Sequence, residues 1–268
     1  MKNVVITGSA RGLGFCMARL FKENDYNVII SDINKEKLEE SMTKLKEIDS
    51  KGEVSYKVCD VTSSKDISSL IDFCDEKYGN IDIWINNAGV NQPDKPIWEL
   101  EEKDIDLVLN IDLKGAVIGS KLAMEYMSKK GRGAIYNVEG YGSNDAMMTG
   151  LSIYGTSKRA ITYFTQALAK ESEDKNTGVI VGRLSPGIMI TDFITNALGN
   201  KEKINLPEKT KKVYNILGDY PEVVADYLVN KMIKNTKNNC CIEWLTNSKA
   251  AWRFITSGFN KRDFFKEN

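Results

Sequence analysis

The chain has 268 residues, with 37 basic and 37 acidic side chains, five cysteines and no histidine. This length suits one large domain with a single core, and a zero net charge gives no general attraction to nucleic acid or anionic membranes. The lack of histidine excludes mechanisms that need an imidazole base or a histidine-bound zinc. Acid–base chemistry must therefore come from tyrosine, lysine, carboxylates or cysteine.

Nothing in the sequence predicts secretion or a membrane span. No apolar run approaches 18 residues, and the first apolar run starts at Val4 without signal-peptide features. The cysteines are odd in number and lack CxxC spacing, as expected of reduced thiols packed as small apolar side chains. We expect a cytoplasmic protein with a small-molecule substrate and no nucleic-acid, membrane or metal partner.

Short β-branched runs alternate with longer segments of helical periodicity. Strands are predicted at residues 4–6, 28–30, 54–58, 81–85, 134–138 and 179–184, and helices at 15–22, 35–48 and 65–78. Strand–helix–strand repetition favours a parallel sheet covered by helices on both faces. The sequence therefore predicts one doubly wound α/β domain over residues 1–268.

A glycine-rich turn lies between the first strand and the first helix. It spans Thr7 to Gly14 and contains Gly8, Gly12 and Gly14. Glycines there allow a tight turn and a close approach of the backbone to a pyrophosphate, and the helix start offers N–H groups to the phosphates. Asp32 follows at the end of the second strand, where a carboxylate can accept hydrogen bonds from ribose hydroxyls. The pattern indicates dinucleotide binding.

Two charges bear on the choice of dinucleotide. Asp32 would repel the 2′-phosphate of NADP(H), whereas Arg11 in the glycine-rich turn could pair with it. Because a desolvated carboxylate facing a phosphate is the larger penalty, NAD(H) is favoured and NADP(H) remains the alternative.

Further motifs occur at fixed places in the pattern: Asp60-Val61, Asn86-Asn87-Ala88-Gly89, Tyr154-Gly-Thr-Ser-Lys158, Pro186-Gly187 and Thr191. Together they resemble the classical short-chain dehydrogenase/reductase family over residues 2–195. The resemblance implies a Rossmann fold with a seven-stranded, mostly parallel sheet, a nicotinamide cofactor, and a homotetramer or homodimer. It also implies that residues 241–245 form the seventh strand.

Tyr154 and Lys158 are four residues apart on a predicted helix and so share one face. An ammonium beside a phenol lowers the phenol pKa, which would let Tyr154 exchange a proton with an alcohol or carbonyl. The resemblance adds that Lys158 contacts the nicotinamide ribose, that Asp60 contacts the adenine, and that Ile188 and Thr191 flank the carboxamide. The expected cofactor-binding residues are Gly8, Ser9, Arg11, Gly12, Leu13, Gly14, Asp32, Ile33, Asp60, Val61, Asn87, Ala88, Gly89, Tyr154, Lys158, Pro186, Gly187, Ile188 and Thr191.

The chain departs from the family pattern where a serine normally holds the substrate oxygen. That position is Gly140, and Ser143, Tyr141 and Ser152 are the candidate substitutes, with Ser143 preferred. The stretch from Asn137 to Ser143 resembles the chlorophyll b reductase-like branch of the family. A second departure concerns the family's catalytic asparagine: Asp112 occupies its position, unless a one-residue bulge presents Asn110 instead.

The substrate region is assigned to residues 188–215, and a C-terminal extension to 245–268, with an extra amphipathic helix over 247–259. Apolar residues such as Met147, Met148, Phe193, Ile194 and Leu198 favour a bulky apolar or alicyclic substrate, for example a hydroxysteroid, a bile acid or a chlorophyll b-like compound. The expected activity interconverts a secondary alcohol and a ketone. Because Gly140 cannot donate a side-chain hydrogen bond, a cofactor-binding sensor or scaffold with weakened catalysis is the alternative, and an epimerase or dehydratase is a third reading.

Overall fold

A single parallel sheet forms the middle layer of the computed structural model, which describes residues 1–190, 208–259 and 262–265. Every neighbouring pair of its seven strands is parallel, in the order β3-β2-β1-β4-β5-β6-β7. The chain reverses its direction of winding between β3 and β4, so the carboxyl ends of β1 and β4 mark the point where such sheets bind ligands. The strands are β1 Asn3–Thr7, β2 Asn27–Asp32, β3 Val54–Val58, β4 Ile83–Asn86, β5 Gly133–Val138, β6 Val179–Ser185 and β7 Cys240–Glu243.

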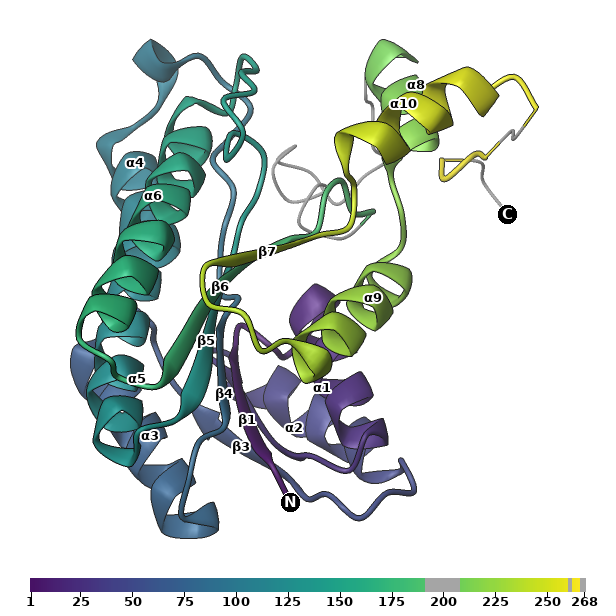
Figure 1. Ribbon diagram of the computed structural model, residues 1–268. Helices are drawn as coiled ribbons and strands as arrows, with labels where there is room; N and C mark the ends of the chain where they lie inside the picture. Colours follow the sequence, from purple (N-terminus) through teal and green to yellow (C-terminus); the bar gives the residue numbers. More distant parts are fainter. Residues whose placement is uncertain (191–207, 260–261, 266–268) are drawn as a thin grey trace.

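Helices cover both faces of this sheet. In Figure 1, α3, α4, α5 and α6 lie on one side and α1, α2 and α9 on the other, whereas α8 and α10 stand apart at the upper end. This arrangement confirms the predicted Rossmann fold. The helices are α1 Gly12–Glu23, α2 Lys35–Lys46, α3 Ser64–Tyr78, α4 Glu102–Val108, α5 Ala116–Lys130, α6 Ser152–Asp174, α8 Glu208–Leu217, α9 Pro221–Lys234 and α10 Asn247–Thr256, with a 3₁₀ turn at Ile97–Glu99 and a π-helical segment at Leu109–Gly115.

The core follows from the alternation of side chains along the strands. Val4 and Ile6 of β1 pack with α1, α2 and α9, while Val5 between them packs with α3 and α5 on the opposite face. All three are fully buried. Strands buried on both faces have no polar face, which is why their sequences are continuous apolar runs.

The C-terminal extension is tied to the segment that follows β6 through one buried carboxylate. Asp219 accepts hydrogen bonds from Trp244 Nε1 at 2.7 Å, Arg253 Nη1 at 2.7 Å and Arg262 Nη1 at 3.0 Å. The backbone of Asp219 also pairs with that segment, donating to the carbonyl of Ile188. The predicted extra helix is present as α10, and it ends three residues earlier than expected.

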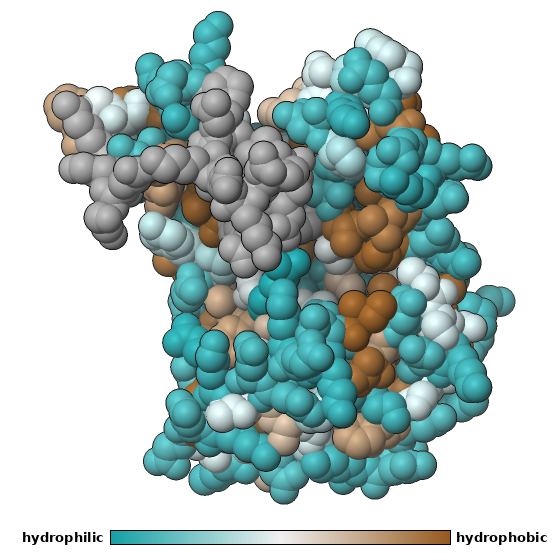
Figure 2. Space-filling model, turned by 180° about the vertical axis from the view of Figure 1, so that it is seen from behind, coloured by the Kyte–Doolittle hydropathy of each residue, from teal (hydrophilic) through white to brown (hydrophobic). Residues whose placement is uncertain are grey.

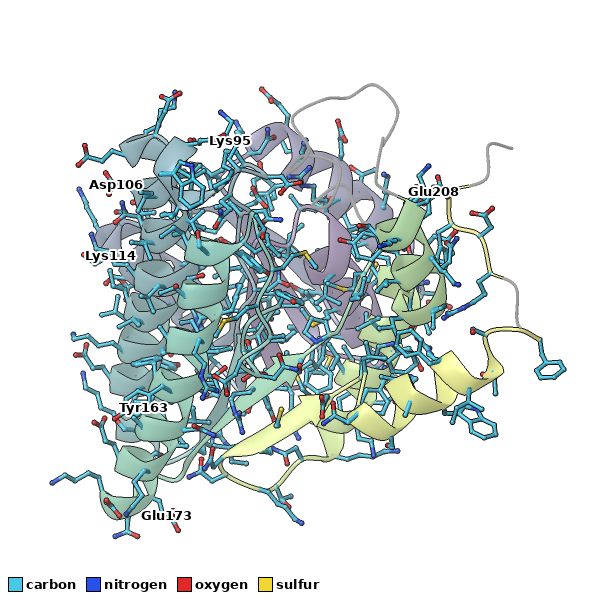
Figure 3. The ribbon with its side chains drawn as sticks, turned by 90° about the horizontal axis from the view of Figure 1, so that it is seen from above. Lys95, Asp106, Lys114, Tyr163, Glu173 and Glu208 are labelled. Carbon is cyan, nitrogen blue, oxygen red and sulfur yellow. The ribbon has the colours of Figure 1, made fainter. Side chains whose placement is uncertain are left out.

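The outer surface is mostly hydrophilic in the view of Figure 2, interrupted by hydrophobic groups. On α6, Tyr163 points away from the sheet, as Figure 3 shows, and is exposed, whereas Tyr154 and Lys158 on the same helix are buried. Within the described ranges, no helix combines the length and apolar character needed to cross a membrane.

Candidate active site

The turn between β1 and α1 needs glycine at two positions for different reasons. Gly8 has a positive φ of 61°, and a Cβ there would approach the Cα of Ala88 to 2.6 Å. At Gly14 a Cβ would lie 2.5 Å from the carbonyl oxygen of Gly8. Both backbones therefore pack at distances that only glycine permits. This packing brings the turn against the loop that follows β4.

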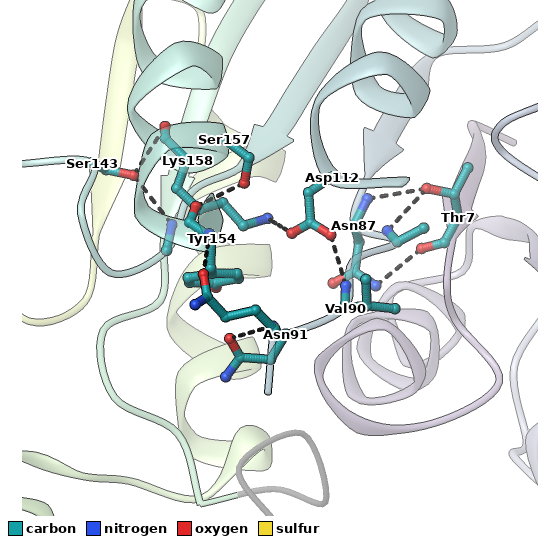
Figure 4. Close-up of polar contacts among 12 residues, drawn as sticks. Thr7, Asn87, Val90, Asn91, Asp112, Ser143, Tyr154, Ser157 and Lys158 are labelled. Carbon is teal, nitrogen blue, oxygen red and sulfur yellow. Dashed lines mark hydrogen bonds and ion pairs between the residues drawn. The ribbon is translucent and has the colours of Figure 1, made fainter. Parts of the chain in front are cut away.

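Asn87 and Thr7 hold these two loops together. The side-chain amide of Asn87 donates to the carbonyls of Thr7 at 2.9 Å and Gly8 at 2.8 Å. In return, the Thr7 hydroxyl accepts from the backbone N–H groups of Asn87 and Ala88. Ser9 anchors the turn to β2, because its buried hydroxyl accepts from the N–H of Ser31 at 2.9 Å. The loops expected to bind a cofactor are thus fixed in place (Figure 4).

The start of α1 fits a diphosphate. Within the described residues, no side chain caps this helix, and a Cβ at Gly12 would meet nothing within 4 Å. The first-turn N–H groups of α1 and the positive end of its dipole therefore face a space that a phosphate can occupy. Leu13 is buried beneath the turn, and Arg11 is exposed beside it. The residues present therefore fit the pyrophosphate of a nicotinamide dinucleotide.

The remaining cofactor candidates line the carboxyl ends of the strands. Asp32 ends β2 and accepts from the N–H of Asn34, with Ile33 exposed beside it. Asp60 follows β3 and accepts from Thr62, while Val61 packs against Gly115. Pro186, Gly187 and Ile188 follow β6, and a Cβ at Gly187 would lie 2.7 Å from the Cβ of Leu245. Thr191, Phe193, Ile194 and Leu198 lie outside the described residues.

Tyr154 and Lys158 lie on one buried face at the start of α6. Their exposed fractions are 8% and 5%, and the Lys158 Nζ lies 5.4 Å from the centre of the Tyr154 ring. Lys158 forms an ion pair with Asp112, with 2.9 Å between Nζ and Oδ2. Figure 4 shows Lys158 and Asp112 facing one another beside Tyr154. The structure therefore brings these three predicted residues together.

Asp112 reaches Lys158 from the π-helical segment that joins α4 to α5. The side chain is 1% exposed, and its Oδ1 accepts from the N–H of Val90 at 2.7 Å. The helix is distorted here, as a bulge would require, but the residue that faces Lys158 is Asp112 and not Asn110. A carboxylate thus stands where the family pattern has a neutral amide.

Burial sets the proton equilibria of this cluster. It raises the pKa of Tyr154; Lys158 acts against this rise, and Asp112 adds to it. Burial alone would lower the pKa of Lys158, but the charges of Asp112 and Tyr154 outweigh it and raise that pKa. The expected lowering of the Tyr154 pKa is therefore wrong for the free protein, because desolvation exceeds the effect of an ammonium that Asp112 already neutralises. Tyr154 is a protonated phenol at neutral pH.

The three candidates for the missing serine differ in position. Ser143 Oγ accepts from the N–H of Gly140 at 3.2 Å and donates to the carbonyl of Lys158 at 3.3 Å, so both contacts are with backbone. Tyr141 donates to the carbonyl of Met147, and Ser152 is exposed at the start of α6. To donate to a substrate oxygen, the Ser143 hydroxyl must give up its hydrogen bond to the Lys158 carbonyl.

Gly140 leaves room that the Tyr154 phenol uses. A Cβ at this position would lie 2.3 Å from the Tyr154 hydroxyl and 3.1 Å from Cγ of Lys158. A serine there cannot coexist with this position of the phenol, so the glycine is part of the packing of the site.

Gly140→Ser should therefore lower kcat instead of improving it. Displacing a catalytic hydroxyl by about 1 Å costs on the order of 100-fold in rate, and we expect a loss of this size in turnover of a carbonyl substrate. Gly155→Ser is the matched control, since a Cβ there meets its nearest neighbour at 3.8 Å. Equal or higher activity in Gly140→Ser would contradict the steric argument.

Sequence reasoning missed Gln92, which lies in the loop after β4. Its Oε1 accepts from the N–H groups of Ile153 and Tyr154, at 2.7 and 2.9 Å, at the start of α6. These partners are 61 and 62 residues away, and no local motif signals such a contact. Val90 was missed for the same reason: its backbone N–H orients Asp112.

A dinucleotide cradle next to a buried tyrosine–lysine pair defines a nicotinamide-dependent oxidoreductase. Comparison with known proteins agrees with this class. A family model described as short chain dehydrogenase matches residues 2–202. The chain therefore belongs to the short-chain dehydrogenase/reductase family, whose members are NAD(P)-dependent oxidoreductases, and the predicted family is confirmed.

Two plant relatives are similar to this chain in sequence, and one solved structure is similar to it in fold. The chain is 34% identical over 265 residues to chlorophyll(ide) b reductase NOL of Oryza sativa subsp. japonica, covering 95% of this chain and 74% of the relative. It is 30% identical to the probable chlorophyll(ide) b reductase NYC1 of Arabidopsis thaliana, covering 99% of this chain. The chain spans only about half, 55%, of the length of that relative. The crystal structure of levodione reductase superposes with a TM-score of 0.82 at 23% identity, covering 93% of this chain and 98% of that one.

Proposed function

We propose that this protein reduces a carbonyl group on a bulky, largely apolar or alicyclic substrate, with NADH as the hydride donor. The observation that carries the proposal is the buried Tyr154 phenol beside an Asp112–Lys158 ion pair. Burial raises the pKa of this phenol, which favours its protonated form at neutral pH. A protonated phenol is the acid that a reduction needs, because the carbonyl oxygen gains negative charge as hydride arrives. The relatives named as chlorophyll(ide) b reductases support the reductive direction.

The cofactor would occupy the carboxyl ends of β1, β2 and β4. Its pyrophosphate would lie against the N-terminus of α1, and the adenosine ribose would lie beside Asp32. When bound, the nicotinamide supplies the hydride. The chain's own part is to place Tyr154 where it donates its phenolic proton to the substrate oxygen, and to keep Lys158 charged beside it.

Two adjacent loops support the apolar substrate class. Met147 and Met148 are 91% and 50% exposed on the loop between β5 and α6. Gly150 of that loop contacts Asp94 of the loop after β4. The exposed Trp98 lies four residues after Asp94. Large apolar side chains exposed on these two loops favour binding of an apolar ligand.

The preference for NADH rests on Asp32. Asp32→Ala removes the carboxylate that would face a 2′-phosphate, so NADPH affinity should improve by about tenfold or more, while NADH affinity falls. Titration of each reduced cofactor by nicotinamide fluorescence measures both changes. A wild-type protein that already binds NADPH more tightly than NADH would refute this assignment.

The activity is tested by mixing the protein with NADH and a panel of carbonyl compounds: chlorophyllide b, a 3-ketosteroid, levodione and diacetyl. Loss of nicotinamide absorbance with an alicyclic member, and less with diacetyl, is the expected result. Cofactor binding without any turnover would instead favour the sensor or scaffold, for which the absent serine at Gly140 is the argument. Light scattering of the same sample tests the expected homodimer or homotetramer.

A further inference from the structure

The side chain of Gln92 is held in one defined orientation. It is 1% exposed, and its Oε1 accepts two backbone hydrogen bonds, from the N–H groups of Ile153 and Tyr154. Since both partners are donors, the atom facing them must be the oxygen, which settles the orientation of the carboxamide. The backbone N–H of Gln92 is fixed as well, because it donates to Asn91 Oδ1 at 3.0 Å.

The other end of this carboxamide lacks an acceptor. Across the part of the chain that the structure describes, the buried Nε2 of Gln92 has no hydrogen-bond partner. A buried amide nitrogen left in this way costs about 1–3 kcal/mol. Because Oε1 is bonded to the backbone of Tyr154 itself, this unused donor lies against the helical turn that carries the acid of the proposed reaction.

The substrate oxygen has only one side-chain donor, Tyr154, among the groups described so far, and it can accept a second hydrogen bond. A carbonyl oxygen has two lone pairs, and Tyr154 can serve only one of them. Gly140 has no side chain, and the Ser143 hydroxyl is bonded to backbone on both sides. We propose that Nε2 of Gln92 donates the second hydrogen bond to the substrate carbonyl oxygen, in place of the serine absent at position 140. This inference rests on the proposed reductase function.

Such a donor acts mainly on the transition state. Hydride transfer places negative charge on the carbonyl oxygen, and a preorganised N–H in a buried site stabilises that charge more than it stabilises the neutral ketone. Loss of the donor should therefore lower kcat more than it raises KM. A purely structural cap of α6 would not produce this difference.

Gln92→Glu separates the two roles. The ionised carboxylate still accepts from Ile153 and Tyr154 at the helix N-terminus, where negative charge is favourable, and it cannot donate. Because burial raises the pKa of a carboxyl group, the assay is run at a pH high enough to keep this group ionised. With the panel compound that the wild type reduces fastest, we expect kcat to fall about 100-fold, with NADH affinity nearly unchanged and the thermal midpoint lowered by the buried charge. Gln92→Met, which loses both the cap and the donor, should lower kcat by at least as much and also lower the midpoint.

Three outcomes would overturn the inference. Turnover of Gln92→Glu within threefold of wild type would leave Gln92 as a helix cap only. Weakened NADH binding with unchanged kcat would assign Nε2 to the cofactor. A wild-type protein inactive toward the whole panel would refute the proposed function itself, and this inference with it, which distinguishes that failure from the first two.

Discussion

Tyr154→Phe is expected to abolish nearly all carbonyl reduction while leaving NADH binding intact. Loss of a positioned proton donor costs about 10²- to 10⁴-fold in rate, and we expect a loss near the upper end because the site has no histidine to take over. The ring itself stays, so its packing beside Lys158 and Gly140 is kept. Initial rates of NADH oxidation measure the loss, and fluorescence titration measures the cofactor affinity.

Tyr163→Phe is the matched control for this variant. Tyr163 lies on the same helix but is 76% exposed and points away from the sheet. It should keep wild-type turnover. Loss of a general acid lowers the rate at least about 100-fold. If Tyr154→Phe retained more than about a tenth of the wild-type rate, the phenol would not be the proton donor.

Asp112→Asn is expected to move the pH dependence of both directions of the reaction toward lower pH. Removing the carboxylate leaves the Lys158 charge opposed only by Glu139, which is itself paired with Arg183, and this less compensated cation lowers the pKa of the nearby Tyr154 phenol. Reduction needs the protonated phenol, so its rate falls as pH rises through that pKa. Alcohol oxidation needs the phenolate, so its rate rises through the same pKa. The variant should therefore lose reduction, and gain oxidation, at a lower pH than the wild type.

The charges that face Lys158 come from three elements: Asp112 on the π-helical segment, Tyr154 on α6, and Glu139 after β5. Glu139 is paired with Arg183, at 3.4 Å, and is kept in the variant. Profiles of kcat/KM against pH, with Asp106→Asn on the exposed face of α4 as control, provide the test. An unchanged or upward-shifted profile in Asp112→Asn would mean that Asp112 does not control the phenol.

The same substitution should destabilise the fold. A buried ion pair that loses one partner leaves an uncompensated charge, which costs about 3–5 kcal/mol. Asparagine still accepts from Val90, so part of the local geometry is retained. The pH profiles should therefore be recorded well below the thermal midpoint of the variant.

Sequence patterns predicted the sheet well, because strands buried on both faces are apolar runs that need no tertiary information to recognise. Errors are confined to their ends: Ile81 lies before β4, which begins at Ile83. The helix spacing predicted that Tyr154 and Lys158 share a face, and the family pattern indicated Asp112 with Asn110 as the alternative; the structure places Asp112 against Lys158. The net direction of the Tyr154 pKa was not, because desolvation depends on packing that no spacing reveals.

Contacts between loops that are distant in the sequence could not be predicted from it either. Gln92 and the start of α6 are brought together only by the order of strands in the sheet, and the room taken up by the phenol at Gly140 appears only once the helix is placed. Glycine at position 140 suggested a missing group from the sequence alone. In the structure it is a packing requirement.

The carboxylate of Asp219 has a consequence for protein engineering. Asp219 binds Arg253 and Arg262 through its side chain, and its backbone pairs with Ile188 and Ile190, so the C-terminal tail is tied to the described segment that follows β6. Replacing the tail with that of another protein, in order to change selectivity, would leave the buried Asp219 carboxylate without its partners Arg253 and Arg262. A chimera should exchange positions 219, 253 and 262 together.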